Sequence, residues 1–427
     1  MIPSTGGPLT RLERGALALG MLLAVGLMWP LRGYLTDDTF IHLQYARHLS
    51  LGHGLVFNPG ERVYGCTSPL WATLIADGMA LHLDGLKVAR ALGLVSTLAS
   101  IGLFLQLMRR TIGTPGIRAA ATLAWAANAW MLRWSLSGME TPLAVALILA
   151  GFVAFTEGQQ WGSRPVRTGA LWALAALTRP EAVLLLMLWG LFLLVDTENR
   201  AGLRRLVFGA LPPIVIYGSW LLFARLYFGT FWPVTLEAKA AGGEGFAYHA
   251  ANLWRQIRIV GATDGALAVL VVTQNLIVYR TTVLPQVTSF TAGLERSLIH
   301  WGKWFADHSS QDAEIAAPDI GAIGYYSQRR VLDLAGLVTP RMIPLLEQST
   351  PEDVVADLRF ASFARPDYLI DRAPEPYDLL RRSPYASCFV TLGHADVPNL
   401  GIARPGQVTY SIYRIDWSPY DSLRVTR

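Results

Sequence analysis

Two adjacent acidic residues, Asp37 and Asp38, open the densest polar stretch of the chain, directly after its first apolar run. Neighbouring carboxylates repel each other and are costly near a low-dielectric boundary, so they need a partner such as a metal ion, an arginine or a substrate hydroxyl. Either carboxylate can then act as a general base that takes a proton from an acceptor hydroxyl. The alternative is structural, because aspartate is a favoured cap for a helix, here one that begins at about Phe40.

Further charged residues could bind an anion. Glu140 precedes an apolar run, and Arg179 and Glu181 flank a proline inside another one. A guanidinium is permanently charged and contacts phosphate in a bidentate manner, which makes Arg179 the best candidate for a phosphate ligand. The alternative is a salt bridge from Arg179 to Glu181 or Glu140 that only shapes the chain reversal. Lys239 could contact a phosphate or, more simply, a lipid headgroup.

The sequence offers little support for a metal centre. His42 and His53 lie near the acidic pair, but they lack the spacing of paired metal ligands, and we expect both on the surface of a loop. A carboxylate pair can work with or without an ion, so a divalent cation at Asp37 and Asp38 stays open. We expect the two cysteines, Cys66 and Cys388, to be unpaired thiols, although one bridge between them is the alternative.

The chain that carries these residues is poor in charge. Its 427 residues are 52% hydrophobic and 16% charged, against roughly 25% charged in an average soluble domain. The apolar residues gather in runs long enough to span a bilayer as helices. A net charge of +5 would suggest nucleic acid in a soluble protein. Here most basic residues lie beside apolar runs, where membrane topology and anionic headgroups explain them, so we expect membrane lipid and no nucleic acid as a partner.

The apolar runs predict an all-α polytopic membrane protein. The clear spans are residues 15–31, 88–108, 117–134, 141–156 and 206–228. The stretch 168–195 is long for one span and has Thr178-Arg179-Pro180-Glu181 at its middle. Because proline removes a helix hydrogen bond and charges resist burial in lipid, we expect two short helices, 168–178 and 182–195, that meet at a polar hairpin. About seven transmembrane helices result.

Arginine placement supports this division. With seven crossings, every short cytoplasmic loop is basic, as the positive-inside rule requires, through Arg11, Arg14, Arg109, Arg110, Arg118, Arg164, Arg167, Arg200, Arg204 and Arg205. The first span then stays uncleaved, and residues 32–87 form a large external loop in which 69–83 lie as an amphipathic helix in the interface. Glu140, Arg179 and Glu181 fall at external ends of spans, so they could converge on one cavity.

From about residue 285 the composition becomes that of a soluble domain. Residues 314–317 and 330–334 are typical of strands, and 298–307 and 354–360 of helices, which together indicate a small α/β domain. We therefore expect a transmembrane domain over residues 1–284 and a soluble domain over 285–427. Residues 266–279 form a weaker apolar run. If this run does not cross the membrane, the soluble domain is extracytoplasmic, which is our expectation; if it crosses, the domain is cytoplasmic.

A series of ordered motifs runs along the chain. The motifs are Asp37-Asp38, Gly52-His53-Gly54 running on to Asn58-Pro59-Gly60-Glu61-Arg62, Thr67-Ser68-Pro69-Leu70-Trp71, Ser137-Gly138-Met139-Glu140-Thr141-Pro142, Leu177-Thr178-Arg179-Pro180-Glu181, Tyr227-Phe228-Gly229-Thr230, Pro318-Asp319-Ile320-Gly321-Ala322 and Asp333-Leu334-Ala335-Gly336-Leu337. Together they resemble the motifs of GT-C fold glycosyltransferases, and most closely those of the terminal arabinofuranosyltransferase family.

The resemblance implies a GT-C-like glycosyltransferase of the plasma membrane, with its active side extracytoplasmic. It implies a polyprenyl-phosphate sugar donor, either arabinofuranose or a hexose, and a cell-envelope glycan, lipid or protein as acceptor. Asp37 and Asp38 become the catalytic candidates, one as base and the other as its support or a metal ligand. The candidates for binding donor phosphate or sugar are Arg179, Glu181, Glu140, Asn58, Glu61 and Lys239.

Departures from the family pattern keep an alternative open. Such relatives carry further spans between the Tyr227 motif and the soluble domain, so this chain resembles an internally shortened copy. The alternative is therefore a non-catalytic relative that binds glycolipid or scaffolds envelope assembly. The stretches Leu43-Gln44-Tyr45 and Tyr64-Gly65-Cys66 stand where the family pattern has an arginine and an acidic residue, respectively, which leaves the sugar and the acceptor open. A transporter or flippase is disfavoured, because no internal repeat is visible and the charges gather on one side.

Overall fold

A computed structural model of the chain describes residues 7–158, 161–195, 200–235, 237–238, 268–398 and 406–425. The chain folds as two compact units. Unit 1 consists of Met1–Tyr34, Thr67–Phe231 and Gln256–Pro285, and unit 2 of Leu35–Cys66, Trp232–Arg255 and Gln286–Arg427. The segment that carries Asp37 and Asp38 thus belongs to the same unit as the C-terminal region.

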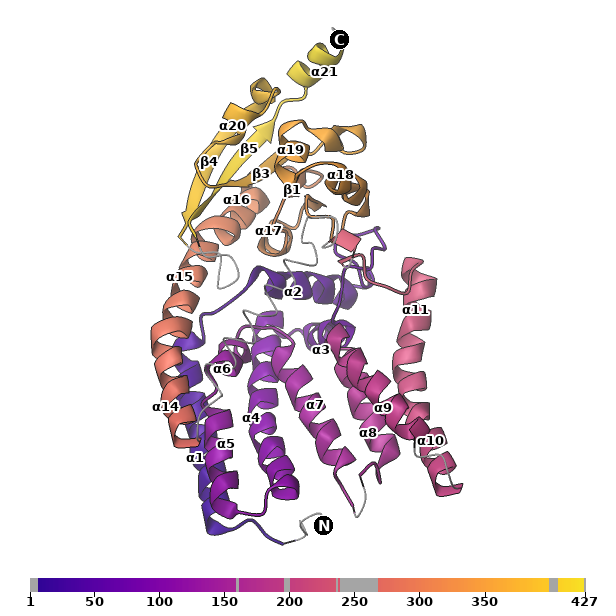
Figure 1. Ribbon diagram of the computed structural model, residues 1–427. Helices are drawn as coiled ribbons and strands as arrows, with labels where there is room; N and C mark the ends of the chain where they lie inside the picture. The colour runs from indigo at the N-terminus through magenta and orange to yellow at the C-terminus, as the bar shows by residue number, and fades with distance from the viewer. Residues whose placement is uncertain are drawn as a thin grey trace. The chain divides into compact units, whose positions relative to one another are not determined.

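Unit 1 is built of helices that run side by side (Figure 1). They are α1 (Arg11–Met28), η1 (Trp29–Leu31), α3 (Pro69–Ala80), α4 (Gly85–Thr111), α5 (Pro115–Ala126), α6 (Ala129–Ser135), α7 (Thr141–Phe155), α8 (Pro165–Ala176), η2 (Pro180–Ala182), α9 (Val183–Val195), α10 (Arg200–Pro213), η3 (Ile214–Gly218), α11 (Ser219–Phe228), α14 (Ala268–Val278) and η4 (Tyr279–Val283).

Among the described helices, three are long and apolar enough to cross a membrane: Arg11–Leu31, Gly85–Thr111 and Gly202–Phe228. Thr141–Phe155 and Pro180–Val195 are apolar but shorter. Three of the expected spans are therefore present at full length, while the count of seven crossings stays a prediction.

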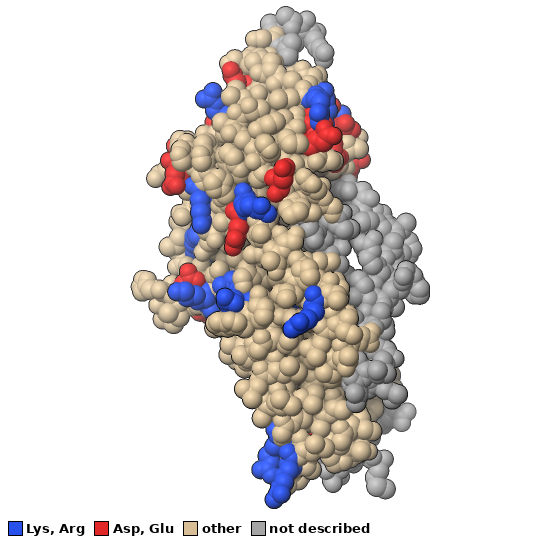
Figure 2. Space-filling model, turned by 90° about the vertical axis from the view of Figure 1, so that its left-hand side faces the viewer, with Lys and Arg blue, Asp and Glu red and all other residues tan. Residues whose placement is uncertain are grey.

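Unit 1 exposes apolar side chains that water would not favour. Only 6% of the most apolar window in Gly202–Phe228 is buried, and side chains such as Leu222 and Leu226 are exposed. Figure 2 shows another face of the molecule, the left-hand side of Figure 1 where α1 and α14 lie, and the lower half of that face carries few charges and ends in basic side chains. Contiguous apolar surface of this extent is typical of a lipid-facing protein.

The polar hairpin predicted inside 168–195 is confirmed, and a second break was missed. Helix α8 ends at Ala176 and η2 begins at Pro180. By contrast, the expected span 117–134 is wrong, because it is divided into α5 and α6. Asn128 stands between them as the N-cap of α6, where its side-chain oxygen accepts a hydrogen bond of 2.9 Å from the Met131 N–H.

One buried carboxylate joins three helix ends of unit 1. Glu13 lies in the first turn of α1 and is fully buried. It pairs with Arg118 of α5 at 2.8 Å and with Arg109 of α4 at 3.6 Å. The beginning of α1, the end of α4 and the beginning of α5 therefore lie together, which agrees with the prediction that their arginines share one side of the membrane.

Unit 2 contains a five-stranded mixed sheet in the order β2-β1-β3-β5-β4. The strands are β1 (Glu314–Ala317), β2 (Arg330–Asp333), β3 (Tyr368–Ala373), β4 (Phe389–Val397) and β5 (Val408–Ile415). Strands β2 and β3 run parallel to β1, while β5 is antiparallel to β3 and to β4. The two strands expected from the sequence are confirmed as β1 and β2, and the other three were not predicted.

The helices of unit 2 include α2 (Asp37–Ser50), η5 (Glu295–Ile299), α16 (His300–His308), α17 (Gly321–Ser327), η6 (Pro340–Met342), α18 (Ile343–Gln348), α19 (Pro351–Ala356), η7 (Arg359–Ser362), α20 (Leu379–Arg382), η8 (Ala386–Cys388) and α21 (Ser418–Val425). Helix α15 (Leu284–Leu294) lies across the unit boundary. From residue 268 onward, the apolar run expected at 266–279 is part of one helical run from α14 to α16, which also contains the helix expected at 298–307. Both cysteines are buried and unpaired, as expected.

Candidate functional site

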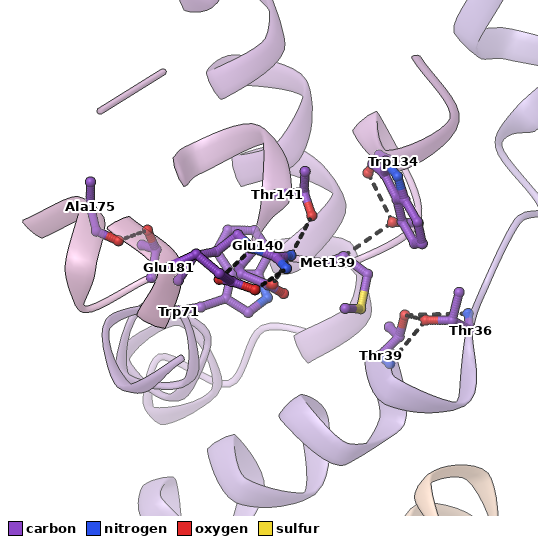
Figure 3. Close-up of polar contacts among 12 residues, drawn as sticks. Thr36, Thr39, Trp71, Trp134, Met139, Glu140, Thr141, Ala175 and Glu181 are labelled. Atoms are coloured by element: carbon purple, nitrogen blue, oxygen red, sulfur yellow. Dashed lines mark hydrogen bonds and ion pairs between the residues drawn. The ribbon is translucent and has the colours of Figure 1, made fainter. Parts of the chain in front are cut away.

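Asp37 and Asp38 occupy the first turn of α2, which begins three residues earlier than expected. Thr36 is its N-cap: its hydroxyl accepts the Thr39 N–H and the Thr39 hydroxyl accepts the Thr36 N–H, both at 3.3 Å (Figure 3). The structural alternative, in which an aspartate caps α2, is therefore wrong. The first turn still favours negative charge, because unpaired N–H groups there carry partial positive charge.

Asp37 uses both carboxylate oxygens to hold another helix. One oxygen accepts the Gly321 N–H at 2.7 Å and the other accepts the Ala322 N–H at 2.8 Å, both at the beginning of α17. Position 321 requires glycine, because a Cβ there would lie 2.0 Å from the carbonyl oxygen of Asp37. The role of Asp37 in this geometry is to fix α2 against α17.

A third carboxylate and an arginine complete this cluster. Asp319 accepts hydrogen bonds from the Tyr410 hydroxyl at 2.6 Å and from Arg372 at 2.7 Å. Burial, followed by the nearby charge of Asp319, raises the pKa of Asp37 to about 7, although its two backbone N–H donors oppose the shift. Sequence reasoning missed these three residues: Asp319 lay inside a quoted motif, whereas Arg372 and Tyr410 come from strands with no motif.

Asp38 differs from its neighbour in exposure. Its side chain is exposed, whereas Asp37 is partly buried and bound to α17. A ligand that approaches α2 from solvent can therefore reach Asp38. The catalytic roles of Asp37 and Asp38 stay predictions, and the two carboxylates differ in whether solvent can reach them.

Asn58 and Glu61 lie together against the edge strand β2. The Asn58 side-chain amide donates to the Val331 carbonyl at 3.0 Å and accepts the Val331 N–H at 3.1 Å, so it continues the sheet as a backbone neighbour would. Asn58 also donates to Glu61 at 2.8 Å, and Glu61 pairs with Arg330. These polar groups hold the first loop to the sheet, and the contact of Asn58 and Glu61 with donor phosphate or sugar stays a prediction.

In unit 1, Arg179 lies between two carboxylates. Its Nη1 donates to Glu140 at 2.9 Å and to the Thr141 hydroxyl at 3.3 Å, and its Nε and Nη2 donate to Glu181 at 3.3 and 3.1 Å (Figure 3). The side chain of Glu140 is 5% exposed and that of Glu181 is 71% exposed. The salt bridges named as the alternative to phosphate binding are therefore present.

Helix α3 positions both segments of this cluster. The Trp71 indole N–H donates to the Gly138 carbonyl at 3.0 Å, and the Leu70 N–H donates to the Leu177 carbonyl at 3.1 Å. Trp71 is fully buried. The Thr67-to-Trp71 motif thus fixes the two loops that carry Glu140 and Arg179.

Three further residues were singled out in the sequence: Lys239, His42 and His53. Lys239 lies outside the described residues. His53 is exposed as expected, but the expectation for His42 is wrong, since this side chain is only 6% exposed on the inner face of α2. Among the residues that the structure describes, no group of three or more His, Cys, Asp or Glu is placed to hold a metal ion.

The fold is shared with a membrane glycosyltransferase of the GT-C class. The structure of ArnT from Cupriavidus metallidurans, bound to undecaprenyl phosphate, matches with a TM-score of 0.50 at 13% identity, over 93% of this chain and 98% of that one. At this identity the likeness shows the fold alone, a helix-rich body with a small sheet domain.

The sequence is similar to curated terminal beta-(1->2)-arabinofuranosyltransferases, which confirms the resemblance seen in the motifs. The protein of Corynebacterium glutamicum is 27% identical over 285 residues, which are 56% of this chain and 39% of the relative. That of Mycobacterium tuberculosis is 31% identical over 235 residues, 50% of this chain and 36% of the relative. The chain thus spans well under half the length of these relatives. Residues 289–413 match a family model described as a domain of unknown function, DUF8728.

Proposed function

We propose that the chain is a membrane glycosyltransferase that moves a sugar from a polyprenyl-phosphate donor to an acceptor hydroxyl on the extracytoplasmic face. The acceptor is a cell-envelope glycan, lipid or protein, and the sugar is arabinofuranose or a hexose. The proposal rests on the different surroundings of the two aspartates. Asp37 accepts hydrogen bonds from the N-terminus of α17, whereas Asp38 beside it is exposed to solvent. The named relatives and the shared GT-C fold support the same reaction.

Asp38 acts as the general base in this mechanism. Its carboxylate takes the proton of the acceptor hydroxyl while the hydroxyl oxygen forms a bond to the anomeric carbon of the donor sugar. The bond from that carbon to the phosphate oxygen breaks, and polyprenyl phosphate leaves with the bonding electrons. Asp37 contributes by fixing α2, because a base must stay within hydrogen-bond reach of the proton it removes.

Arg179 is the proposed ligand of the donor phosphate. Two of its three nitrogens are held by the exposed Glu181, and such a surface ion pair is worth only about 0–1 kcal/mol. A phosphate, which takes the same bidentate geometry as a carboxylate, can therefore replace Glu181. The buried Glu140 keeps the third nitrogen and with it the orientation of the guanidinium.

The prenyl chain of the donor would lie against the apolar helices of unit 1, whose surface is exposed to lipid in this proposal. The topology predicted from the arginines assigns residues 32–87 and the domain over 285–427 to the extracytoplasmic face of the plasma membrane. It also predicts that Glu140, Arg179 and Glu181 lie at extracytoplasmic ends of spans.

The test is transfer of radiolabel from a panel of polyprenyl-phosphate sugars, arabinose and hexoses included, by the purified chain in lipid nanodiscs. A crude envelope glycan and glycolipid fraction serves as acceptor. We expect label to move from one donor of the panel and from no nucleotide sugar. Absence of transfer from every donor, under conditions in which an active relative transfers, would contradict the proposal.

A further inference from the structure

A cavity of about 390 Å³ opens in unit 2 where β3 begins and β5 ends. This volume lies within the range of about 300–1,000 Å³ that small-molecule sites occupy. Polar and aromatic side chains line it: Ser310, Asp367, Tyr368, Arg414, Asp416 and Trp417. The proposed reaction uses none of these residues, and the sequence motifs include none of them.

Three of the lining side chains are held in place by the backbone around them. The Asp367 carboxylate accepts the Glu314 N–H at 2.9 Å, and the Asp416 carboxylate accepts the Ser418 N–H at 3.0 Å. The Trp417 indole N–H donates to the Pro366 carbonyl at 3.1 Å. A ligand would therefore meet groups whose rotamers are already fixed, which lowers the entropy that binding costs.

The lining combines charges of both signs where β3 begins and β5 ends. Tyr368 of β3 and Arg414 of β5 are directly paired in the antiparallel register. The Tyr368 ring packs against Phe305, with the ring centroids 5.0 Å apart. The hydrogen bonds of Ser418, together with the charge of Arg414, lower the pKa of Asp416, so this carboxylate is ionised at neutral pH.

This combination selects for a neutral ligand rich in hydroxyl groups. An apolar ligand would remove water from the carboxylates and the guanidinium without replacing its hydrogen bonds, which is costly. An anion would meet two aspartates, and a cation would meet Arg414. A sugar hydroxyl both donates to a carboxylate and accepts from a guanidinium, and the C–H face of a sugar ring can pack on an indole or a phenol ring.

We propose that this cavity is a saccharide-binding subsite that holds part of a neutral glycan acceptor. The proposal rests on the proposed function only in calling the glycan an acceptor, because binding itself needs no donor and no catalysis. A subsite of this kind would retain a growing or branched glycan while its terminal hydroxyl reacts elsewhere.

The experiment measures binding of a neutral arabino-oligosaccharide and a gluco-oligosaccharide to the full chain in nanodiscs by saturation-transfer NMR and calorimetry. The chain carries Asp38→Asn, so binding is read apart from turnover. Arg414→Gln and Asp416→Asn test the cavity; the asparagine oxygen can still accept the Ser418 N–H. Arg381→Gln, which alters an exposed arginine of the same unit, is the matched control.

We expect one of the oligosaccharides to bind saturably, with at least tenfold weaker binding in either cavity variant and unchanged binding in Arg381→Gln. Absence of binding by both oligosaccharides, or equal binding by the cavity variants, would overturn the inference. A tighter fit for a phosphorylated oligosaccharide than for its neutral counterpart would overturn it as well. Glycan binding in a chain that transfers no sugar would leave the subsite standing while the proposed function fails.

Discussion

Asp37 and Asp38 are neighbours in the sequence, yet their side chains meet different surroundings. Asp37 is partly buried against α17 and lies near the charge of Asp319, while Asp38 is exposed. The sequence indicated that one of the pair was a base and the other its support, but it could not say which. The difference comes from contacts with Gly321 and Ala322, which lie more than 280 residues further along the chain.

Because the pKa of Asp37 is raised in the folded chain, the free energy of unfolding should depend on pH. Burial first, and then Asp319, raise its pKa from the ordinary value of 3.8 to about 7. At a pH between these two pKa values, the Asp37 carboxyl is protonated in the folded chain and ionised in the unfolded chain. Stability therefore falls as the pH rises through this window, by at most about 1.4 kcal/mol per pH unit for one proton. Asp37→Asn, which cannot ionise, should show a smaller fall.

Thermal unfolding midpoints between pH 4 and 8 check this prediction, with the exposed Asp307→Asn as control. The control should keep the slope of the unaltered chain. An identical slope in Asp37→Asn would show that this carboxylate does not hold the proton.

A second prediction concerns the ion pair between Glu181 and Arg179. Because it is a weakly bound, exposed partner of Arg179, Glu181→Gln should leave the guanidinium more available and tighten binding of undecaprenyl phosphate by up to about fivefold. Glu140→Gln should instead weaken binding and lower stability by about 2 kcal/mol, since it removes the buried partner. Calorimetric titration in nanodiscs measures both effects.

Glu157→Gln is the matched control, because Glu157 forms a comparable exposed pair with Arg167 in the same unit. Its affinity for undecaprenyl phosphate should be unchanged. Weaker binding in Glu181→Gln would mean that Glu181 itself belongs to the phosphate site.

Among the secondary-structure elements, the close contact between α2 and α17 should be sensitive to a larger side chain at position 321. Gly321→Ala places a methyl group 2.0 Å from the Asp37 carbonyl oxygen, so the two helices must separate. Overpacking of this kind costs about 1–3 kcal/mol. We expect a lower unfolding midpoint and slower transfer with unchanged binding of undecaprenyl phosphate, whereas Gly33→Ala, which meets nothing within 4 Å, should change neither. Normal transfer by Gly321→Ala would show that the contact does not support the base.

The elements also show which features a sequence can reveal. The hairpin around Pro180 was predictable, because proline and two charges interrupt an apolar run. The break at Asn128 was not, since a single polar residue hardly lowers the hydropathy of the run around it. Strand β3 pairs with β1 and with β5 across long stretches of chain, so its partners cannot be read from local patterns. Strands β4 and β5 follow each other in the chain, and neither was recognised from its local pattern.

At the scale of the whole molecule, the arrangement in the membrane is testable by labelling. Both native cysteines are buried, so an introduced thiol gives the main signal. In intact cells, a membrane-impermeant maleimide should modify Glu347→Cys of unit 2, which is exposed and predicted to be extracytoplasmic. It should modify Arg164→Cys only after permeabilisation. The opposite pattern would invert the predicted topology.

Asp38 is the proposed base of the sugar transfer, and comparison of Asp38→Asn with Asp37→Asn in the transfer assay measures its contribution. General bases typically contribute about 10²–10⁴-fold to a rate, so Asp38→Asn should lower kcat by at least about 100-fold, with unchanged affinity for undecaprenyl phosphate and an unchanged unfolding midpoint. Asp37→Asn should lose less activity and more stability. Transfer at the full rate by a folded Asp38→Asn chain would show that Asp38 is not the base.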